Sequence, residues 1–386
     1  MSLRAAVASK SFCTERGGAE HIIIVQPEEA GDFATEQAAV VEGYRRALKE
    51  LGLLPESAIF RRIYLSDALA QARKLNGGGL LPRPEEDPVA VSRIEQPPLP
   101  GAKVALFAYH VTDPLGLSKR RIGRKQVLVE KNGARHLWST GLCAGVDSSR
   151  PSAEAQTRDV FSELIGVLEE NAASLRENCV RTWVYVKDID VFYSRMVKSR
   201  RALFVEQGLT DETHYIASTG IEGACAHPSD LVALDAYSQL DLVPGQLSYL
   251  NAFDRMCATH RYGVTFERGA SVSYRDRTHY FISGTASIDE NGEVLHRGDV
   301  ESQFDRALGN VGALLDTGSA RLEDLMYLIV YLREPKDFPR VRARLGQYMP
   351  ELPALYVEGP VCRPDWLVEV EGIAIARQDK PHLPQF

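Results

Sequence analysis

One arrangement of strands and a helix occurs three times in the sequence, at intervals of more than 100 residues. Each copy opens with a short apolar segment that begins on histidine. A helix follows, in which apolar residues recur three and four positions apart, and then a strand that ends in charged residues. Because this interval is too long for a solenoid repeat, the sequence predicts three related domains. The histidine-led segments are residues 21–26, 136–141 and 279–284.

The last strand of each copy distinguishes the third copy from the other two. Aligning 103–109 and 231–237 with 367–373 places Ala105 and Ala233 where the third strand has Glu369. Glu369 and Glu371 alternate with apolar residues, as in a strand with one buried face. Spacing alone also allows a solvated acidic face. The asymmetry favours an enzyme in which one of three sites survives, and it also permits a protein in which all three have decayed.

We place the three units at residues 1–115, 116–250 and 251–386. The first unit is the most divergent. It is interrupted at 76–101 by a stretch with six prolines and three consecutive glycines. We expect this stretch to be an exposed insertion or a covering loop without regular structure.

Composition limits the class of protein and its partners. The chain has 386 residues, of which 44% are hydrophobic and 25% charged, as in compact globular proteins. The net charge of −7 argues against nucleic acid as a partner, because phosphate binding needs an excess of Lys and Arg. We find no apolar run that could span a bilayer and no secretory signal, so we expect a cytoplasmic protein without a membrane partner.

The cysteines and glycines carry no cofactor motif. Six cysteines are scattered without a Cys-x-x-Cys pair, which favours reduced thiols. No group of His, Cys and Asp has the spacing of metal ligands, and the glycines at 77–79 are not followed by the Lys-Ser or Lys-Thr of a phosphate loop. We therefore expect no metal and no other cofactor, although a metal site assembled from distant residues stays open.

Several residues are candidates for binding an anion. In unit two, 214–224 crowds small, hydroxyl-bearing and glycine residues, which permit close backbone approach and donate hydrogen bonds; a plain turn would use the same residues. Arg124, in a basic run, faces either solvent or a ligand between units. In unit three, Arg275 and Arg277 fall in a probable hairpin turn and are expected to be exposed. The other candidates are Tyr215, Ser218, Thr219, Gly220, Arg268 and Arg363.

The unit pattern resembles the RidA/YjgF family of imine deaminases. The resemblance rests on an early strand ending in Ser283-Gly284, a long helix, a Val-Tyr-Leu strand at 330–332, and the final strand at 368–374. Such proteins are homotrimers with a site in each cleft between subunits. The resemblance implies an α/β (α+β) chain of three RidA-like, chorismate-mutase-like units, with mixed sheets covered by helices. It also implies a monomer that forms its own pseudo-trimer.

More closely, 214–223, 266–269 and 362–369 resemble the chorismatases. In that family the acid matching Glu369 donates a proton to chorismate, and pyruvate is released. The hydrolase branch tends to have alanine at the positions of Gly269 and Cys362, whereas the hydroxybenzoate branch has glycine and cysteine. The resemblance thus implies an enzyme of secondary metabolism that makes 3-hydroxybenzoate, with 4-hydroxybenzoate as an open second product. Glu369, Cys362 and Gly269 are its expected catalytic residues.

The chemistry of chorismate agrees with these residues. Chorismate is a dianion with an enolpyruvyl ether, so its cleft needs cations, hydrogen-bond donors and an acid near the vinyl carbon. Burial would raise the pKa of Glu369 and make it an acid near neutral pH. Arg268 is the first choice for a carboxylate, helped by Tyr215, Ser218 and Thr219 across the cleft. Arg124 and Arg363 are second choices.

Three alternatives stay open at this point. One is the hydrolase branch, which yields a dihydroxycyclohexadiene carboxylate. The others are an imine deaminase and a non-catalytic small-molecule binding protein. The arginine that precedes the last strand of the RidA proteins is missing here, where Ala354, Leu355 and Tyr356 stand, which argues against imine deamination by the usual route.

Overall fold

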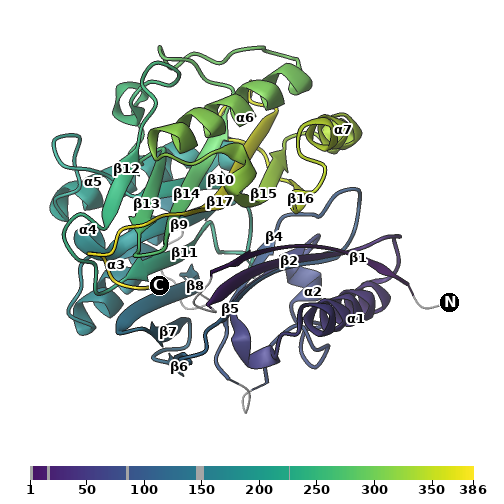
Figure 1. Ribbon diagram of the computed structural model, residues 1–386. Coiled ribbons are helices and arrows are strands. Elements are labelled where there is room, and N and C mark those ends of the chain that lie inside the picture. Colours follow the sequence, from purple (N-terminus) through teal and green to yellow (C-terminus); the bar gives the residue numbers. More distant parts are fainter. Residues whose placement is uncertain (1–2, 15–17, 84–86, 145–151, 226) are drawn as a thin grey trace.

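The computed structural model describes residues 3–14, 18–83, 87–144, 152–225 and 227–386. Within these residues the chain forms three mixed sheets, each built from one continuous part of the sequence. In Figure 1 the sheets face the middle of the molecule and the long helices lie outside them. The predicted fold class, three mixed α+β units in one chain, is confirmed.

The first sheet has five strands and is covered by α1 (Phe33–Leu51), with the short α2 (Ala68–Gln71) beside it. Asp32 begins α1 by accepting a hydrogen bond from the Thr35 amide, and Gly52 ends it in the left-handed conformation, with φ of 64°. In spatial order the strands are β1 (Ala5–Cys13), β2 (Ala19–Pro27), β5 (Val104–Thr112), β3 (Ala58–Leu65) and β4 (Ala90–Glu95).

The second sheet has six strands and is covered by α3 (Ala153–Glu170) and α5 (Ile189–Glu206), with the short α4 (Leu175–Asn178) between them in sequence. In spatial order the strands are β10 (Ala217–Glu222), β9 (Cys179–Val186), β11 (Val232–Gln239), β8 (Ala134–Cys143), β7 (Gln126–Lys131) and β6 (Ser118–Arg121).

The third sheet also has six strands, and α6 (Val300–Thr317) and α7 (Phe338–Tyr348) cover it. In spatial order the strands are β12 (Leu247–Leu250), β13 (Gly269–Ser273), β14 (Arg277–Ala286), β17 (Val368–Arg377), β15 (Leu325–Leu332) and β16 (Ala354–Glu358). Short 3₁₀ turns lie at Pro55–Ser57, Thr259–Tyr262, Leu322–Asp324 and Pro335–Asp337.

The alignment of the three final strands is confirmed by their pairing. In each sheet the last of the aligned strands (β5, β11 or β17) lies antiparallel to the strand that follows the first long helix (β3, β9 or β15). The position of Glu369, or of the alanine aligned with it, pairs with a tyrosine on that neighbouring strand. The three pairs are Ala105 with Tyr64, Ala233 with Tyr185, and Glu369 with Tyr331. The three units therefore share one register, and the acid of the third unit replaces an alanine at a structurally equivalent position.

Isolated bridges join the three units to one another. Glu95 of the first unit pairs with Ala224 of the second, Ile221 of the second with Val361 of the third, and Pro98 of the first with Val357 of the third. The units thus close into a ring. The largest hydrophobic core draws residues from all three sheets inside this ring and continues under α6 and α7. Separate cores lie under α1 and under α3 and α5. Burial of these inner faces drives the association of the units.

The proline-rich stretch 76–101 is more ordered than expected. Residues 90–95 form β4, which pairs in parallel with β3, so the prediction of no regular structure is wrong for this part. Its prolines lie outside the strand, and Ala90 to Glu95 alternate between buried and more exposed side chains, as an edge strand requires. Residues 84–86 lie outside the described residues.

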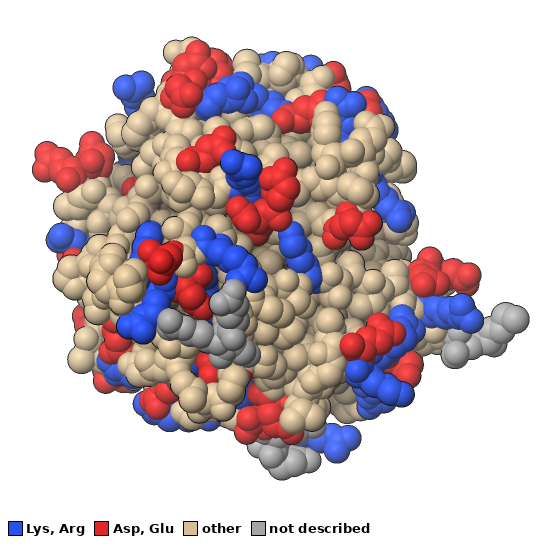
Figure 2. Space-filling view, viewed as in Figure 1, with Lys and Arg blue, Asp and Glu red and all other residues tan. Residues whose placement is uncertain are grey.

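On the face drawn in Figure 2, basic and acidic side chains are interspersed. Among the described residues, no helix is long and apolar enough to cross a lipid bilayer.

Candidate active site

Strand β17 carries a carboxylic acid into a cavity between the second and third units. Glu369 is 5% exposed, and its Oε1 has no hydrogen-bond partner among the described residues. Burial, and secondly the neighbouring Glu371 carboxylate, raise the pKa of Glu369 to about 8. At neutral pH the side chain is therefore mostly protonated and has a proton to donate.

The cavity is walled by both units that meet at this seam. Unit two contributes α5 and β10, and unit three contributes β14, the segment before β13 and the segment between β16 and β17. Its wall combines aromatic rings with two arginines and the Glu369 carboxyl. The lining residues are Tyr193, Arg200, Ser218, Gly220, Tyr262, Phe266, Arg268, Gly284, Ala286, Ile288, Cys362, Trp366 and Glu369.

Two buried arginines in this wall have unused donors. Arg200, on α5, is 2% exposed; its Nε donates to Thr265 Oγ1 at 3.1 Å, and its Nη2 has no partner among the described residues. Arg268 is 4% exposed; its Nη2 donates to the Cys257 carbonyl at 3.1 Å, and its Nε has no partner in the same part of the chain. A buried guanidinium without an acid is costly, so both are suited to an anionic ligand.

The thiol in the wall is neutral. Burial, and secondly the charge of Glu369, raise the pKa of Cys362 to about 12. A thiol in this state is a poor nucleophile, because the thiolate is the reactive form. Cys362 therefore contributes shape and polarity to the cavity.

Two glycines make room for the acid and for a ligand. A Cβ added to Gly284 would overlap the Glu369 carboxyl group, so no larger residue fits on β14 at this position without moving the acid. A Cβ added to Gly220 would lie 3.1 Å from the Tyr193 ring. The approach is closest at Gly284, whereas at Gly220 a larger residue would require the Tyr193 ring to shift slightly.

The structure brings five of the ten residues proposed from sequence to one cavity and places the other five elsewhere. Those in the wall are Glu369, Cys362, Arg268, Ser218 and Gly220, and those outside it are Gly269, Tyr215, Thr219, Arg124 and Arg363.

The five outside residues have other surroundings. Gly269 begins β13 directly after Arg268, and a Cβ added there would meet Leu250 and the Phe281 carbonyl instead of the cavity. Tyr215 stacks beside Phe204.

On β10 the side chain of Thr219 points to the face opposite to that of Ser218 and Gly220. Its hydroxyl accepts hydrogen bonds from Arg181 and from the Gly284 amide and donates one to Glu371. Arg124 is exposed in the turn between β6 and β7. Arg363 lies over the Trp366 ring and donates to the Gly292 carbonyl.

Sequence reasoning missed the wall contributed by α5. Tyr193 and Arg200 are seven residues apart and therefore lie on one face of that helix. The sequence did contain a signal: Arg200 lies four residues after Met196 and so falls on the apolar side of an amphipathic helix. It was hidden within a basic run at 198–201 that also fits a solvated surface.

Glu371, the second acid of β17, belongs to a saturated ionic network. Its carboxylate accepts hydrogen bonds from Arg181 at 2.8 Å, from the Trp183 ring nitrogen at 2.8 Å and from Thr219, and Arg62 lies 3.7 Å away. The network links all three units and lies next to the candidate site. Neither acid of β17 lies on a solvated face, because both are at most 5% exposed.

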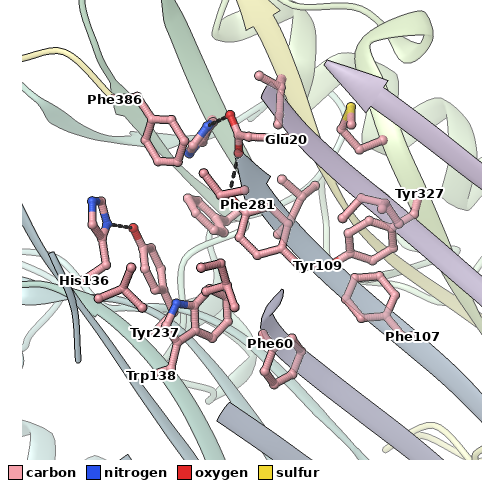
Figure 3. Close-up of a pocket in the computed structure, with 18 of the residues that line it drawn as sticks. Glu20, Phe60, Phe107, Tyr109, His136, Trp138, Tyr237, Phe281, Tyr327 and Phe386 are labelled. Carbon is pink, nitrogen blue, oxygen red and sulfur yellow. Dashed lines mark hydrogen bonds and ion pairs between the residues drawn. The ribbon is translucent and has the colours of Figure 1, made fainter. Parts of the chain in front are cut away.

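A second cavity lies at the centre of the ring, lined mainly by apolar and aromatic side chains of all three units (Figure 3). Its carboxylate, Glu20, accepts hydrogen bonds from Arg277, His279 and Tyr109. Burial alone would raise the pKa of Glu20, but these three partners outweigh it and lower the pKa to about 2. Glu20 is therefore ionised and cannot serve as a proton donor. Arg277, expected to be exposed, is 1% exposed, because this pairing with Glu20 buries it.

Comparisons with known proteins show what the chain is similar to. The family described as "Endoribonuclease L-PSP" matches residues 271–376. The 3-aminoacrylate deaminase RutC of Acinetobacter baylyi is 31% identical over 96 residues, which is 24% of this chain and 76% of that protein.

Two longer matches cover more of the chain. A 3-hydroxybenzoate synthase of Streptomyces hygroscopicus is 31% identical over 261 residues, which is 61% of this chain and 73% of that protein. A crystal structure of a chorismatase superposes with a TM-score of 0.63 and 18% identity, covering 97% of this chain and 99% of that one. The chain belongs to the chorismatase family, which is related to the RidA superfamily.

Proposed function

We propose that the protein cleaves chorismate to 3-hydroxybenzoate and pyruvate. The observation that carries the proposal is the placement of Glu369, whose pKa is raised by burial, in a cavity with two arginines that lack acidic partners among the described residues. The similarity to a 3-hydroxybenzoate synthase supports this choice of substrate and product. The proposed catalytic residue is Glu369, and the proposed substrate-binding residues are Arg268, Arg200, Ser218 and Gly220.

The two arginines match the two carboxylates of chorismate. Arg268 contributes to the electrostatics of Glu369 and therefore lies near the proton donor. We assign it to the enolpyruvyl carboxylate, next to the carbon that receives the proton. Arg200, on the α5 side of the cavity, then holds the ring carboxylate. Each pairing satisfies a donor that is otherwise buried without a partner.

The reaction begins with proton transfer from Glu369 to the methylene carbon of the enolpyruvyl group, which leaves a cation at the ether carbon. The neighbouring ring hydroxyl attacks the ring carbon that bears the ether, that carbon–oxygen bond breaks, and pyruvate leaves with the ether oxygen. The arene-oxide-like product opens to 3-hydroxybenzoate. The proton lost by the attacking hydroxyl restores Glu369, so no water is consumed.

Cys362 is proposed to favour this internal attack over attack by water. The hydrolase reaction is the second candidate: water adds to the cation at the ether carbon, and a dihydroxycyclohexadiene carboxylate is released with pyruvate. Cys362 faces the cavity, whereas an alanine at Gly269 would meet Leu250 and the Phe281 carbonyl at 3.1 Å. We therefore assign the choice of product mainly to Cys362. The same wall would decide whether 4-hydroxybenzoate is also formed.

The test is to incubate the purified protein with chorismate and to identify the products by mass spectrometry. In deuterium oxide the methyl group of pyruvate should gain one deuterium. In water carrying heavy oxygen, pyruvate trapped at once as lactate should stay unlabelled, whereas the hydrolase route would label its keto oxygen. Chorismate recovered unchanged would contradict the proposal.

Two variants test whether Glu369 donates the proton and whether Cys362 controls which product is formed. Glu369→Gln should abolish turnover while the protein stays folded, and Glu334→Gln, at an exposed position, is the matched control. Cys362→Ala should raise the proportion of the dihydroxycyclohexadiene carboxylate. An unchanged product ratio would contradict the role of Cys362.

We also propose that the chain acts as a monomer, with domain boundaries near residue 115 and just before residue 247. The second boundary lies earlier than the expected residue 250, because β12 pairs with β13 in the third sheet. The bridges between units close the ring within one chain, so no second copy is needed to complete the site. Light scattering should give a mass near 42.7 kDa. A mass two or three times larger would contradict the monomer.

A further inference from the structure

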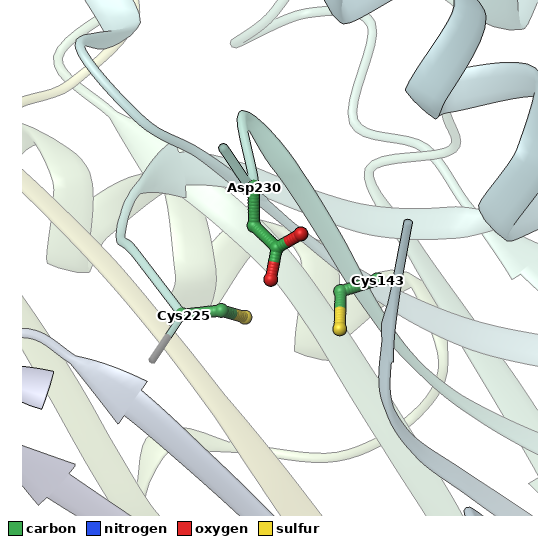
Figure 4. A group of neighbouring side chains, drawn as sticks. All are labelled: Cys143, Cys225 and Asp230. Carbon is green, nitrogen blue, oxygen red and sulfur yellow. The ribbon is translucent and has the colours of Figure 1, made fainter. Parts of the chain in front are cut away.

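Three side chains that can bind a metal converge away from the candidate active site. Figure 4 shows Cys143, Cys225 and Asp230 turned toward one another. Their two sulfur atoms and a carboxylate oxygen all lie within 4.8 Å of one another. Asp230 is 4% exposed, and both cysteines are half-buried. Cys225 and Asp230 lie five residues apart in the connection between β10 and β11, whereas Cys143 comes from the end of β8, far away in the sequence.

The cluster occupies the place in unit two that the candidate active site occupies in unit three. Cys143 pairs with Ala233 across β8 and β11, just as Ala286 pairs with Glu369 across β14 and β17. Asp230 precedes Ala233 by three residues. Trp366 stands at the same distance before Glu369. Ala286 and Trp366 both line the active-site cavity.

Cys225 completes this correspondence. The Glu95 amide donates to the Ala224 carbonyl across the seam between units one and two. The Glu222 amide donates to the Pro360 carbonyl across the next seam in the same way. Cys225 therefore corresponds to Val361, next to the wall of the active-site cavity. Because Ala233 stands where unit three has Glu369, the seam between units one and two has no proton donor at this position. It carries two thiols and a carboxylate instead.

We propose that Cys143, Cys225 and Asp230 bind one Zn²⁺ at the seam between units one and two. Two thiolates and a carboxylate suit this borderline-soft cation. Ligand distances of about 2.3 Å for sulfur and 2.0 Å for oxygen put tetrahedral ligand atoms about 3.5 Å apart, so side-chain rotations that close the cluster by about 1 Å are sufficient. A water molecule would take the fourth position.

Binding requires both thiols to lose their protons, which are released to solvent. Two thiolates and one carboxylate carry three negative charges, and the ion reduces them to one. The Lys125 ammonium, which donates to the Cys143 carbonyl at 3.3 Å and also pairs with Glu163, offsets part of the remaining charge. The ion would link Cys143 at the end of β8 to the loop after β10, whose Ala224 pairs with Glu95 of the first unit. It would therefore stabilise the contact between units one and two.

The experiment uses the full chain, reduced and stripped of metal with a chelator. Zn²⁺ titrated against a chromophoric chelator should bind with one equivalent, and Co²⁺ should give the intense absorption of thiolate-to-metal charge transfer. Cys143→Ser, Cys225→Ser and Asp230→Asn should each weaken Zn²⁺ binding by roughly 100-fold or more. Cys13→Ser, at an exposed cysteine, should leave it unchanged. Absence of stoichiometric binding, or equal binding by all variants, would overturn the proposal.

A second measurement does not depend on the folding of variants. In the wild-type protein, Zn²⁺ should protect Cys143 and Cys225 from alkylation, while Cys13 reacts equally with and without the metal. Peptide mass spectrometry distinguishes the sites. If both cysteines react at the same rate with and without Zn²⁺, the proposal fails. A Cys143–Cys225 disulfide that persists under reducing conditions would also overturn it, because a disulfide leaves no thiolate to bind metal.

Discussion

Glu369 and Glu371 lie two residues apart on β17 and point to the same side of the sheet, yet within the described part of the chain only Glu371 is hydrogen-bonded to its neighbours. Arg181, Trp183 and Thr219 all donate hydrogen bonds to the Glu371 carboxylate. Glu369 faces a cavity, and its Oε1 has no partner among the described residues. After burial, the neighbouring Glu371 carboxylate is the second cause that raises the pKa of Glu369. Strand β17 thus supplies both the acid, Glu369, and a neighbouring carboxylate, Glu371, that raises its pKa.

The first prediction concerns the dependence of activity on pH. Because the pKa of Glu369 is raised to about 8, the reactive protonated form dominates below that pH and is lost above it. We expect kcat/KM for chorismate to be level near pH 7 and to fall about tenfold per pH unit above pH 8. Initial rates of pyruvate release from pH 6 to 10 measure this. A profile that rises through pH 8 would mean that the ionised acid is the active form.

The second prediction concerns the stability of the folded protein. A buried acid with a raised pKa keeps its proton in the folded state after the unfolded state has lost it, so folding is favoured at low pH and weakened as pH rises from 4.5 to 8. Glu369 should lower the free energy of unfolding by about 1.4 kcal/mol per pH unit in this window.

Glu369→Gln removes that titration. The variant should therefore be more stable than the wild type at pH 9, by about 5 kcal/mol at most, and should lose part of the pH dependence. Denaturant unfolding at pH 5, 7 and 9 measures the difference. Glu334→Gln, at an exposed acid, should follow the wild type at all three values. Equal slopes for all three proteins would show that Glu369 is ionised in the folded state.

Much of the fold was readable from the sequence because the units repeat. The alignment of Ala105 and Ala233 with Glu369 predicted the common register that the sheets show. The acid itself was identified because only one of three equivalent strands carries it. The strand β4 was missed, because the prolines around it concealed six residues of alternating character.

The contacts between units were not readable, because they join residues from different copies. Arg277 pairs with Glu20, 257 residues away, so its local hairpin context suggested exposure when it is buried. Arg200 enters the site from a helix of the preceding unit. Gly269 carries a family signature, but strand alternation turns its missing side chain away from the cavity. Local sequence patterns therefore predict the helices and strands, whereas the association of the three units determines which side chains come into contact.

The third prediction separates the two arginines. Arg200→Met and Arg268→Met should each raise KM for chorismate by about 100-fold, because each removes a charge-assisted pairing worth a few kcal/mol. Of these two arginines, only Arg268 lowers the pKa of Glu369, in addition to the lowering by Arg181 of the neighbouring ionic network. Arg268→Met should therefore also shift the alkaline limb of the pH profile to higher pH, while Arg200→Met leaves it in place. Arg340→Met, at an exposed arginine on α7, is the control. Identical pH profiles for both active-site variants would contradict the assignment of Arg268 to the proton donor.

The fourth prediction tests the close approach of β14 to the acid. In Gly284→Ala the new methyl group would overlap the Glu369 carboxyl group, so the acid must rotate out of its position or β14 must shift. We expect kcat to fall at least 100-fold, since catalysis depends on the placement of the proton donor to within about 1 Å. Gly346→Ala, on α7 with no atom within 4 Å of the added carbon, is the matched control and should keep full activity. Wild-type kcat in Gly284→Ala would show that the Glu369 carboxyl need not lie against β14 during the reaction.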